Sequence, residues 1–363
     1  MTLDLSFNQA SSIVSSRALG SLRSLKLSNN RFSTFNAAMF PSLTLLYADK
    51  NFLPTILGLE DCPDLEILSA REQFAVTKGS CFDIDLGVII EARKVYLSSN
   101  RLSWRCLSPS APLRSLQLFD AASCNIQSLP GDFALNFPNV KVLNLNFNSL
   151  AGIEELAHMS CVARLGVAGN RINRLRALCR VLSGMGRSAT GEGCSLQKVD
   201  LRGNPLTVRF YPPPITGNGR PRPQRLKAKE RHNPNPQNPD AADLPSILAE
   251  LDSSDDINVP RPITWGRDSD GSGDTIDDEK THLIDDPYTL PPADIDADRK
   301  YLSHLDDSTR LRRQVFELML YAGSGGSIKY LDGLPVRPAL EWGSEMERSW
   351  AKLEKLGVLQ KAR

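Results

Sequence analysis

The sequence lacks the features that mark a secreted, membrane-spanning or disulfide-stabilised protein. Its first residues, MTLDLSFNQASS, place Asp4 and Asn8 where a secretory signal needs an uninterrupted apolar core. No apolar run approaches the roughly 18 residues of a membrane span. The seven cysteines contain no Cys-x-x-Cys pair and are irregularly spaced, which argues against a disulfide framework or a zinc site. We expect a soluble, intracellular protein with reduced thiols and no membrane partner.

Groups that carry out catalysis are also scarce. The four histidines are scattered, so neither a catalytic triad nor a metal cluster can be assembled from them. No cysteine follows Cys194, which excludes the cysteine-dependent ligase domain that some repeat proteins carry after their repeats. The glycine-rich stretch at 323–327 follows a predicted helix instead of opening one, so it does not cradle phosphate. We expect a protein that is not an enzyme and takes no cofactor.

What the sequence does contain is a repeat. The stretch LRSLKLSNNRF, from Leu22 to Phe32, has leucines at 22, 25 and 27 and an asparagine three residues after the last of them. The same pattern returns with these residues at the key position: Asn8, Asn30, Asn51, Gln73, Asn100, Cys124, Asn148, Asn170 and Asn204. Every interval but the last lies within the roughly 20–29 residues of a leucine-rich repeat.

Each residue type in the pattern has a physical role. A short strand buries its apolar side chains between neighbouring repeats, and the asparagine bonds backbone groups where the chain leaves the strand. The pattern predicts an α/β leucine-rich-repeat solenoid, with a curved parallel sheet and an irregular or helical convex side. In this pattern Cys124 is a small buried turn residue and not a reactive thiol.

The solenoid is predicted to occupy residues 1–211, in about nine repeats of which the first is incomplete. Because the chain begins in mid-repeat with no cap before Leu3, we expect a further region upstream. The longer last interval contains RINRLRALCRVLSGMG, whose apolar residues Leu175, Leu178, Val181 and Leu182 fall on one stripe and predict a convex helix.

Three further segments follow. Residues 212–299 lack periodicity, are rich in proline and aspartate, and have Trp265 and Tyr288 as their only aromatics, which predicts a disordered insertion. Residues 300–340 contain an apolar helix stripe from Leu311 to Met319 and then Leu-Asp-Gly at 331–333, as in the caps that close many intracellular leucine-rich-repeat proteins. Residues 341–363 are predicted to form a C-terminal helix.

Two motifs in the insertion can each be interpreted either as a solvated linker or as a functional site. The stretch DSDGSGDTIDDE, at 268–279, nearly fits a calcium loop, but the prolines close by do not allow the flanking helices, so we interpret it as a solvated acidic linker. The basic run from Arg220 to Arg231 has no interleaved aromatics, so we expect no nucleic-acid partner. A nuclear-import or membrane-surface address is the alternative to a solvated linker there.

A protein-binding surface is predicted on the concave face, because residues that flank the buried strand positions point to that side. The predicted binding residues are an apolar and aromatic band followed by a basic end: Leu45, Tyr47, Ile67, Tyr96, Leu118, Val142, Arg164, Lys198 and Arg202. Contiguity of the band favours a partner site over scattered exposed apolar residues. The acidic segment 240–298 is expected either to be attracted to the basic end and compete with a partner, or to be a spacer.

Four stretches carry a family resemblance: VLNLNFNSL, LGVAGNRI, LRGNPLTVRFYPPP and YLSHLDDSTRLRRQVFELMLYAGSGGSIKYLDGLPV. Together they resemble the C-terminal domain of the fungal septation-initiation and mitotic-exit scaffold of the spindle pole body, which is related to centriolin. The resemblance spans about 1–211 and 300–340. It implies a cytoplasmic scaffold of the cell-cycle cytoskeleton, anchored at the spindle pole body or microtubule-organising centre by anchor proteins. The implied partners are a small GTPase, its regulators and kinases, and the resemblance transfers no individual binding residue.

A second class of function fits the same solenoid. Similar repeat proteins are regulatory subunits that target a phosphatase through the concave face, and this remains the alternative. A tubulin-folding cofactor would need a ubiquitin-like or glycine-rich cytoskeletal domain, which this sequence lacks.

Overall fold

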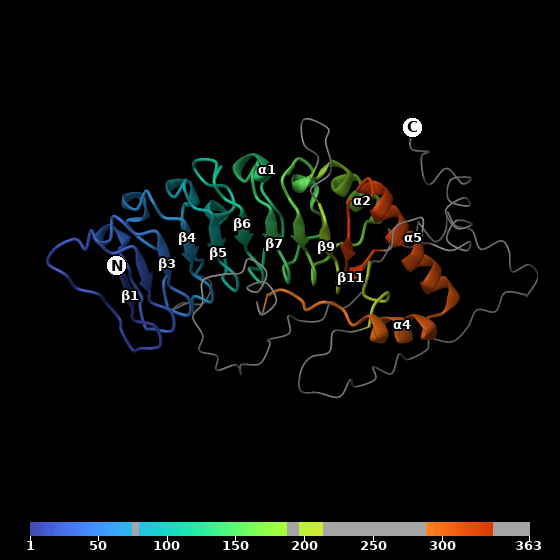
Figure 1. Ribbon diagram of the computed structural model, residues 1–363, viewed down its shortest axis with the longest axis horizontal. Helices are drawn as coiled ribbons and strands as arrows, with labels where there is room; N and C mark the ends of the chain where they lie inside the picture. The colour runs from blue at the N-terminus through green and yellow to red at the C-terminus, as the bar shows by residue number, and fades with distance from the viewer. Residues whose placement is uncertain (75–79, 187–195, 213–287, 337–363) are drawn as a thin grey trace, which may run out of the picture.

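The protein is a curved solenoid in a computed structural model that describes residues 1–74, 80–186, 196–212 and 288–336 (Figure 1). In these residues eleven strands form one sheet in chain order. The strands from β1 to β10 are parallel, and β11 is antiparallel to β10. The repeat strands are β1 (Thr2–Asp4), β2 (Ser24–Lys26), β3 (Leu45–Tyr47), β4 (Ile67–Ser69), β5 (Lys94–Tyr96), β6 (Leu118–Asp120), β7 (Val142–Asn144), β8 (Arg164–Gly166) and β9 (Lys198–Asp200). The predicted leucine-rich-repeat solenoid is confirmed.

The convex side is made of short helical segments, one for most repeats. They are the 3-10 helices η1 (Ala37–Met39), η2 (Leu59–Asp61), η3 (Leu86–Val88), η4 (Trp104–Cys106) and η5 (Glu154–Leu156), and the α-helices α1 (Phe133–Asn136) and α2 (Leu175–Gly184). The α2 helix is the one predicted from the long last interval, and it buries Leu175, Leu178, Val181 and Leu182.

The asparagine at the key position joins two neighbouring repeats. Asn170 Nδ2 donates to Val167 O in its own repeat and to Leu145 O in the preceding one, both at 2.9 Å. Its Oδ1 accepts from Leu150 N at 3.0 Å. A column of such side chains forms hydrogen bonds with backbone groups that have no partner within the short strands. These bonds stabilise the fold, because buried polar groups without hydrogen bonds destabilise it.

The two substitutes for asparagine take the same place. Gln73 Nε2 donates to Ala48 O at 2.8 Å. Cys124 is 2% exposed, and its Sγ lies 3.2 Å from Leu97 O. Burial raises the pKa of this thiol. The prediction that Cys124 is a buried turn residue is confirmed.

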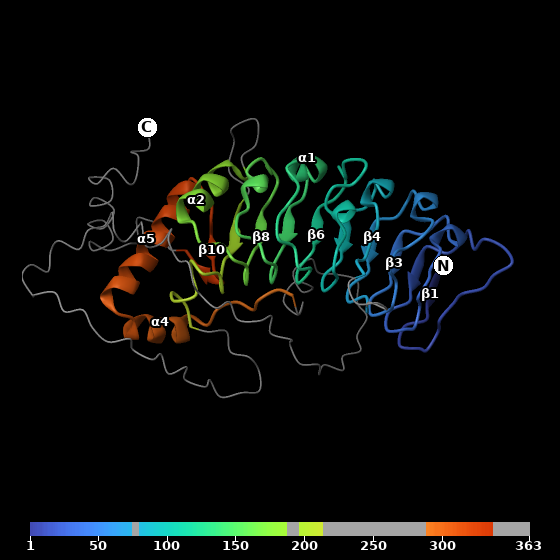
Figure 2. The ribbon, with the colours of Figure 1, turned by 180° about the vertical axis from the view of Figure 1, so that it is seen from behind.

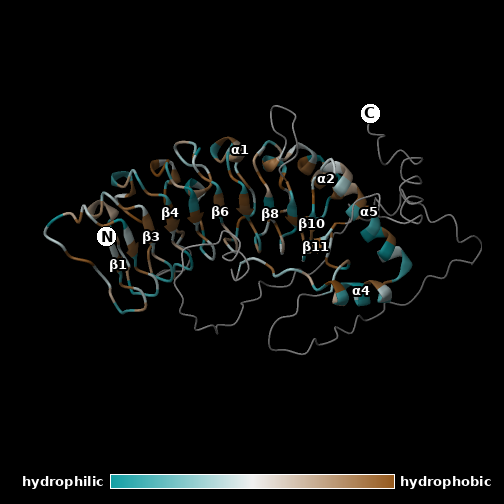
Figure 3. Cartoon of the chain, viewed as in Figure 1, coloured by the Kyte–Doolittle hydropathy of each residue, from teal (hydrophilic) through white to brown (hydrophobic). Residues whose placement is uncertain are grey.

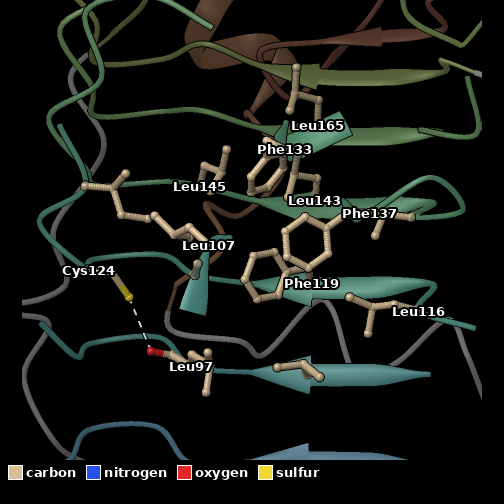
Figure 4. Close-up of a cluster of buried hydrophobic side chains, with 14 of the residues drawn as sticks. Leu97, Leu107, Leu116, Phe119, Cys124, Phe133, Phe137, Leu143, Leu145 and Leu165 are labelled. Carbon is tan, nitrogen blue, oxygen red and sulfur yellow. Dashed lines mark hydrogen bonds between the residues drawn. The ribbon is translucent and has the colours of Figure 1, made fainter. Parts of the chain in front are cut away.

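The core lies between the sheet and the convex segments and runs the length of the solenoid. Figure 4 shows one part of it, where Phe119 from β6 meets Phe133 and Phe137 at α1. The ring centroid of Phe137 lies 5.0 Å from that of Phe119 and 4.7 Å from that of Phe133. Hydrophobic residues follow the strands and convex segments in Figure 3, while α4 is largely hydrophilic. Stacking of the repeats therefore buries a continuous apolar interior.

A helical cap closes the C-terminal end. Helices α4 (Ile295–His304) and α5 (Asp307–Gly323) lead to the hairpin of β10 (Tyr330–Leu331) and β11 (Leu334–Pro335), in which β10 pairs with β9. Asp332 and Gly333 form the two-residue loop, with φ of 54° and 79°. Both values are positive, as a type I′ hairpin turn requires. The predicted cap, with its helix and its Leu-Asp-Gly turn, is confirmed.

The cap is fixed to the last repeat by a buried ion-pair cluster. Arg313 of α5 donates to both carboxylate oxygens of Asp298 at 2.8 and 2.7 Å, to Glu317 at 2.7 Å and to Phe210 O at 3.0 Å. Its guanidinium carbon lies 4.4 Å from the ring centroid of Tyr211. The Phe-Tyr-Pro sequence after the last repeat is thus the docking surface for the cap.

The predicted insertion needs a correction at its C-terminal boundary. Residues 288–299, which we assigned to the disordered segment because of their prolines and aspartates, have defined contacts and include the start of α4. Asp294 caps that helix, since its side chain accepts from the backbone N–H groups of Asp296 and Ala297. The acidic motif at 268–279, the basic run and the predicted helix 341–363 lie outside the described residues.

Candidate functional site

Eight of the nine predicted binding residues lie on the concave face in two rows that run across the strands, and Arg202 follows the last strand of these rows. Register pairs place Leu45, Ile67, Lys94, Leu118, Val142, Arg164 and Lys198 in the first row. The second row contains Tyr47, Ser69, Tyr96, Asp120, Asn144, Gly166 and Asp200. The apolar members of both rows are half-buried, so they stay accessible to a partner.

The apolar band is less continuous than the sequence suggested. Lys94 lies between Ile67 and Leu118 in the first row, and Ser69 separates Tyr47 from Tyr96 in the second. The guanidinium carbon of Arg71 lies 4.5 Å from the ring centroid of Tyr96. The band is therefore a set of apolar positions with cations among them, which suits a partner that carries both apolar and acidic side chains.

The basic end of the face consists of Arg164, Lys198 and Arg202. Lys198 Nζ lies 4.7 Å from the ring centroid of Tyr330 in the cap, and desolvation together with the charge of Arg164 lowers the pKa of Lys198. Arg202 follows β9 and donates to both carboxylate oxygens of Asp200. One of the three cations is thus neutralised within the solenoid.

A line of polar side chains follows the carboxyl ends of the strands. Arg71 Nη2 donates to Asp120 Oδ2 at 2.9 Å, and Ser98 Oγ donates to the same oxygen. Further along, Asn144 and Asn146 are 8% and 2% exposed. We call Arg71, Glu72, Asn144, Asn146 and Arg202 the polar ledge.

The N-terminal part of this line contains another buried carboxylate. Asp49 Oδ1 accepts from Ser69 Oγ at 2.6 Å and from Arg71 N at 2.7 Å. Burial raises the pKa of Asp49 in spite of these hydrogen bonds. Such groups hold neighbouring repeats in register.

Residues 288–293, which we call the strap, lie along the polar ledge. In Figures 1 and 2 the strap is the orange segment that passes below the strands from β7 toward α4. Tyr288 Oη donates to Glu72 Oε1 at 2.8 Å. The carbonyl oxygen of Tyr288 accepts from Asn146 Nδ2 at 3.0 Å and from Asn144 Nδ2 at 3.3 Å.

The remainder of the strap is held at its C-terminal end. Arg202 Nη1 donates to Pro291 O at 2.9 Å, and Ala293 N donates to Gly333 O in the cap hairpin at 3.2 Å. Between these anchors, Leu290 is 8% exposed. The strap runs from the end of β7 to the end of β9, and the Tyr288 side chain reaches Glu72, which follows β4.

The polar ledge and the strap were missed in the sequence analysis. A signal for the polar ledge was present in the sequence. Polar residues stand two places after the ends of several strands, as Arg71, Asn146 and Arg202 do, and a shared position of this kind suggests a shared role. Tyr288 is one of two aromatic residues in the predicted insertion, and no sequence pattern connects it to the solenoid. At the basic end, Arg202 donates to the backbone carbonyl of Pro291, and the expected attraction of the acidic segment 240–298 to this end stays a prediction. Residues 240–287 lie outside the described part.

The described residues contain no group of three or more His, Cys, Asp or Glu side chains that could hold a metal ion. In the same part of the chain, no helix combines the length and the apolar character needed to cross a membrane.

Comparison with known proteins agrees with the repeat pattern. The family model described as Leucine Rich Repeat matches residues 21–43. Over 178 residues the chain is 30% identical to the septation initiation network scaffold protein cdc11 of Schizosaccharomyces pombe, a match that covers 48% of this chain and 15% of that protein. The chain therefore spans a small part of that relative's length. The resemblance inferred from the four sequence stretches is confirmed at this level.

Similar solved structures have low identity. The crystal structure of human trophoblast glycoprotein is 16% identical with a TM-score of 0.44, and covers 56% of this chain and 77% of its own. A leucine-rich-repeat protein of Leptospira interrogans is 17% identical with a TM-score of 0.34, and covers 53% of each chain. Neither likeness bears on function.

Proposed function

We propose that this chain is a non-catalytic protein–protein interaction scaffold of a septation or mitotic-exit pathway, and that it acts in the cytoplasm at the spindle pole body. The observation that carries the proposal is the similarity to the cdc11 scaffold, which covers 48% of the chain. The partners proposed are spindle-pole anchor proteins, regulators of a small GTPase, and kinases.

The concave face is the surface proposed to receive them. Half-buried Leu45, Tyr47, Ile67 and Tyr96 offer apolar area at low entropic cost, since the neighbouring strands hold them in place. Lys94 and Lys198 add positive charge, which favours acidic partners and speeds their encounter.

A capture experiment tests the proposal. The tagged chain is incubated with a fungal extract, and the bound proteins are identified by mass spectrometry. We expect spindle-pole proteins and regulators of a small GTPase to be enriched over a tag-only control. Recovery of a phosphatase catalytic subunit in their place would favour the alternative, a phosphatase-targeting subunit.

A further inference from the structure

The contacts of the strap are those of a bound peptide. Two side-chain amides converge on one backbone carbonyl, that of Tyr288, and a guanidinium holds a second carbonyl three residues later, at Pro291. Groups that bind main-chain carbonyls recognise an extended segment whatever its sequence, and pockets for side chains then add selectivity. The polar ledge has both kinds of contact.

The ledge is held in place by the solenoid and not by the strap. Asn146 Oδ1 accepts from Ala168 N at 2.8 Å, and Asn144 Oδ1 accepts from Asn146 N at 3.2 Å. With both oxygens engaged in this way, each side chain presents its NH₂ group to the strap. Asp200 fixes Arg202 in the same manner. A preorganised set of donors binds a ligand without a large ordering penalty.

A glycine makes room for this arrangement. Gly166 of β8 lies between β7 and β9 in the second row. A methyl group at this position would lie 2.9 Å from Asn146 Oδ1 and 3.2 Å from Asn144 Oδ1. Any larger residue at 166 would therefore force the Asn146 side chain to shift.

The side chains of the strap define what the ledge selects. The Tyr288 hydroxyl is bound by Glu72, its ring centroid lies 5.8 Å from the guanidinium carbon of Arg71, and burial raises the pKa of its phenol. Leu290 is buried. Pro291 and Pro292 have no backbone N–H that would need a partner, and proline favours an extended chain.

We propose that the polar ledge is a binding site for extended protein segments with the pattern tyrosine, any residue, leucine, proline, and that Tyr288–Pro292 is its resident ligand. A partner segment of this chemistry competes with the strap. The strap is tethered through Ala293 to the cap, so its effective concentration at the polar ledge is high. A partner segment must therefore bind the ledge tightly enough to displace the tethered strap. This inference rests on the proposed function only in placing a protein partner on the concave face.

The test uses a fluorescent peptide, DPYTLPPAD, which copies residues 286–294. Fluorescence anisotropy measures its binding to the full chain and to an opened variant, Tyr288→Ala with Leu290→Ala. We expect the opened variant to bind the peptide at least about tenfold more tightly than the parent, because the competing tether is weakened. A peptide with alanine in place of its tyrosine and leucine should not bind.

Two further variants locate the peptide. Adding Asn146→Ala to the opened variant should weaken binding about tenfold, since the amide that holds the tyrosine carbonyl is lost. The matched control is Asn139→Ala, an exposed asparagine whose Nδ2 donates to Arg114 O outside the ledge. This control should leave the peptide affinity unchanged.

The proposal is overturned if a folded opened variant binds the peptide no better than the parent, or if Asn146→Ala and Asn139→Ala have the same effect. Should the opened variant not fold, Tyr288→Phe decides, because it keeps the ring and removes the hydroxyl with its hydrogen bond to Glu72. About threefold tighter peptide binding than the parent is then expected. Peptide binding without capture of spindle-pole proteins would refute the proposed function and leave this inference standing.

Discussion

Arg71 binds Asp120 across an intervening strand, with Nη2 2.9 Å from Oδ2, although 49 residues separate the two in sequence. The carboxylate is almost fully buried and the guanidinium is partly exposed, with side-chain exposures of 2% and 21%. The pair therefore connects repeats that are not adjacent and places the guanidinium beside Tyr96 and the strap.

Removing the cation should leave a buried charge behind. We expect Arg71→Met to lower the free energy of unfolding by about 3 kcal/mol, because Asp120 keeps its desolvation penalty and loses its counter-ion. Adding Asp120→Asn should recover part of the loss. Arg105→Ala, at an exposed pair with Asp83, should change it by less than about 1 kcal/mol. Urea denaturation measures all three, and equal effects of Arg71→Met and Arg105→Ala would contradict this account of the pair.

The cap cluster gives a second stability prediction. Arg313→Met leaves Asp298 and Glu317 without their cation in a buried site, and burial already raises the pKa of Glu317. We expect a loss of about 3–5 kcal/mol and aggregation on heating, because the edge of the last repeat is then poorly covered. The control is Arg310→Ala, at an exposed pair with Asp307. Calorimetry compares the melting temperatures; a cap variant as stable as its control would show that α5 does not close the solenoid.

Asp332 should make stability depend on pH. Desolvation and the neighbouring Asp200 carboxylate raise the pKa of Asp332 to about 7, from the 3.8 of an unperturbed aspartate. Between these two values the folded state holds a proton that the unfolded state has released, so stability falls as pH rises toward and through 7. Arg202 and Tyr211 are the other ionisable groups that influence this carboxyl.

Asp332→Asn removes the titration while keeping the turn. Asparagine tolerates the positive φ at this position, and its Oδ1 can accept from Leu201 N as the carboxylate does. We expect the melting temperature of the parent to fall relative to that of the variant from pH 5 to pH 8. A difference that stays constant over this range would mean that Asp332 does not carry the proton.

The repeat strands could be predicted from the sequence because each one repeats the same chemistry. Leu143 is buried for the same reason as Leu165, and Asn148 and Asn170 bond to equivalent carbonyls. Because chance does not produce such a periodicity, the fold, the buried core positions and the register between neighbouring strands could all be predicted from the sequence. The cap followed as well, from a helical stripe and an Asp-Gly turn.

The strap could not be predicted in the same way. Tyr288 meets Glu72 at a separation of 216 residues, and Tyr288 belongs to no periodic pattern. Proline and aspartate around Tyr288 are typical of disorder, and only the surface of the solenoid gives the segment a defined place. The rows of the predicted band from Leu45 to Val142, with Lys94 among them, followed from the repeat, whereas the contact of Arg71 with the Tyr96 ring did not.

The central claim is that the concave face binds protein partners. Its most direct test is the affinity of a captured spindle-pole protein for the chain. Tyr47→Ala with Tyr96→Ala removes the two aromatic side chains of the second row, and Leu135→Ala removes an exposed side chain of α1 on the convex side. We predict that the double variant melts near the parent temperature but binds the partner with a loss of at least ~2 kcal/mol, or about 30-fold in Kd, while Leu135→Ala has no effect. An unchanged Kd for a folded double variant would contradict the claim.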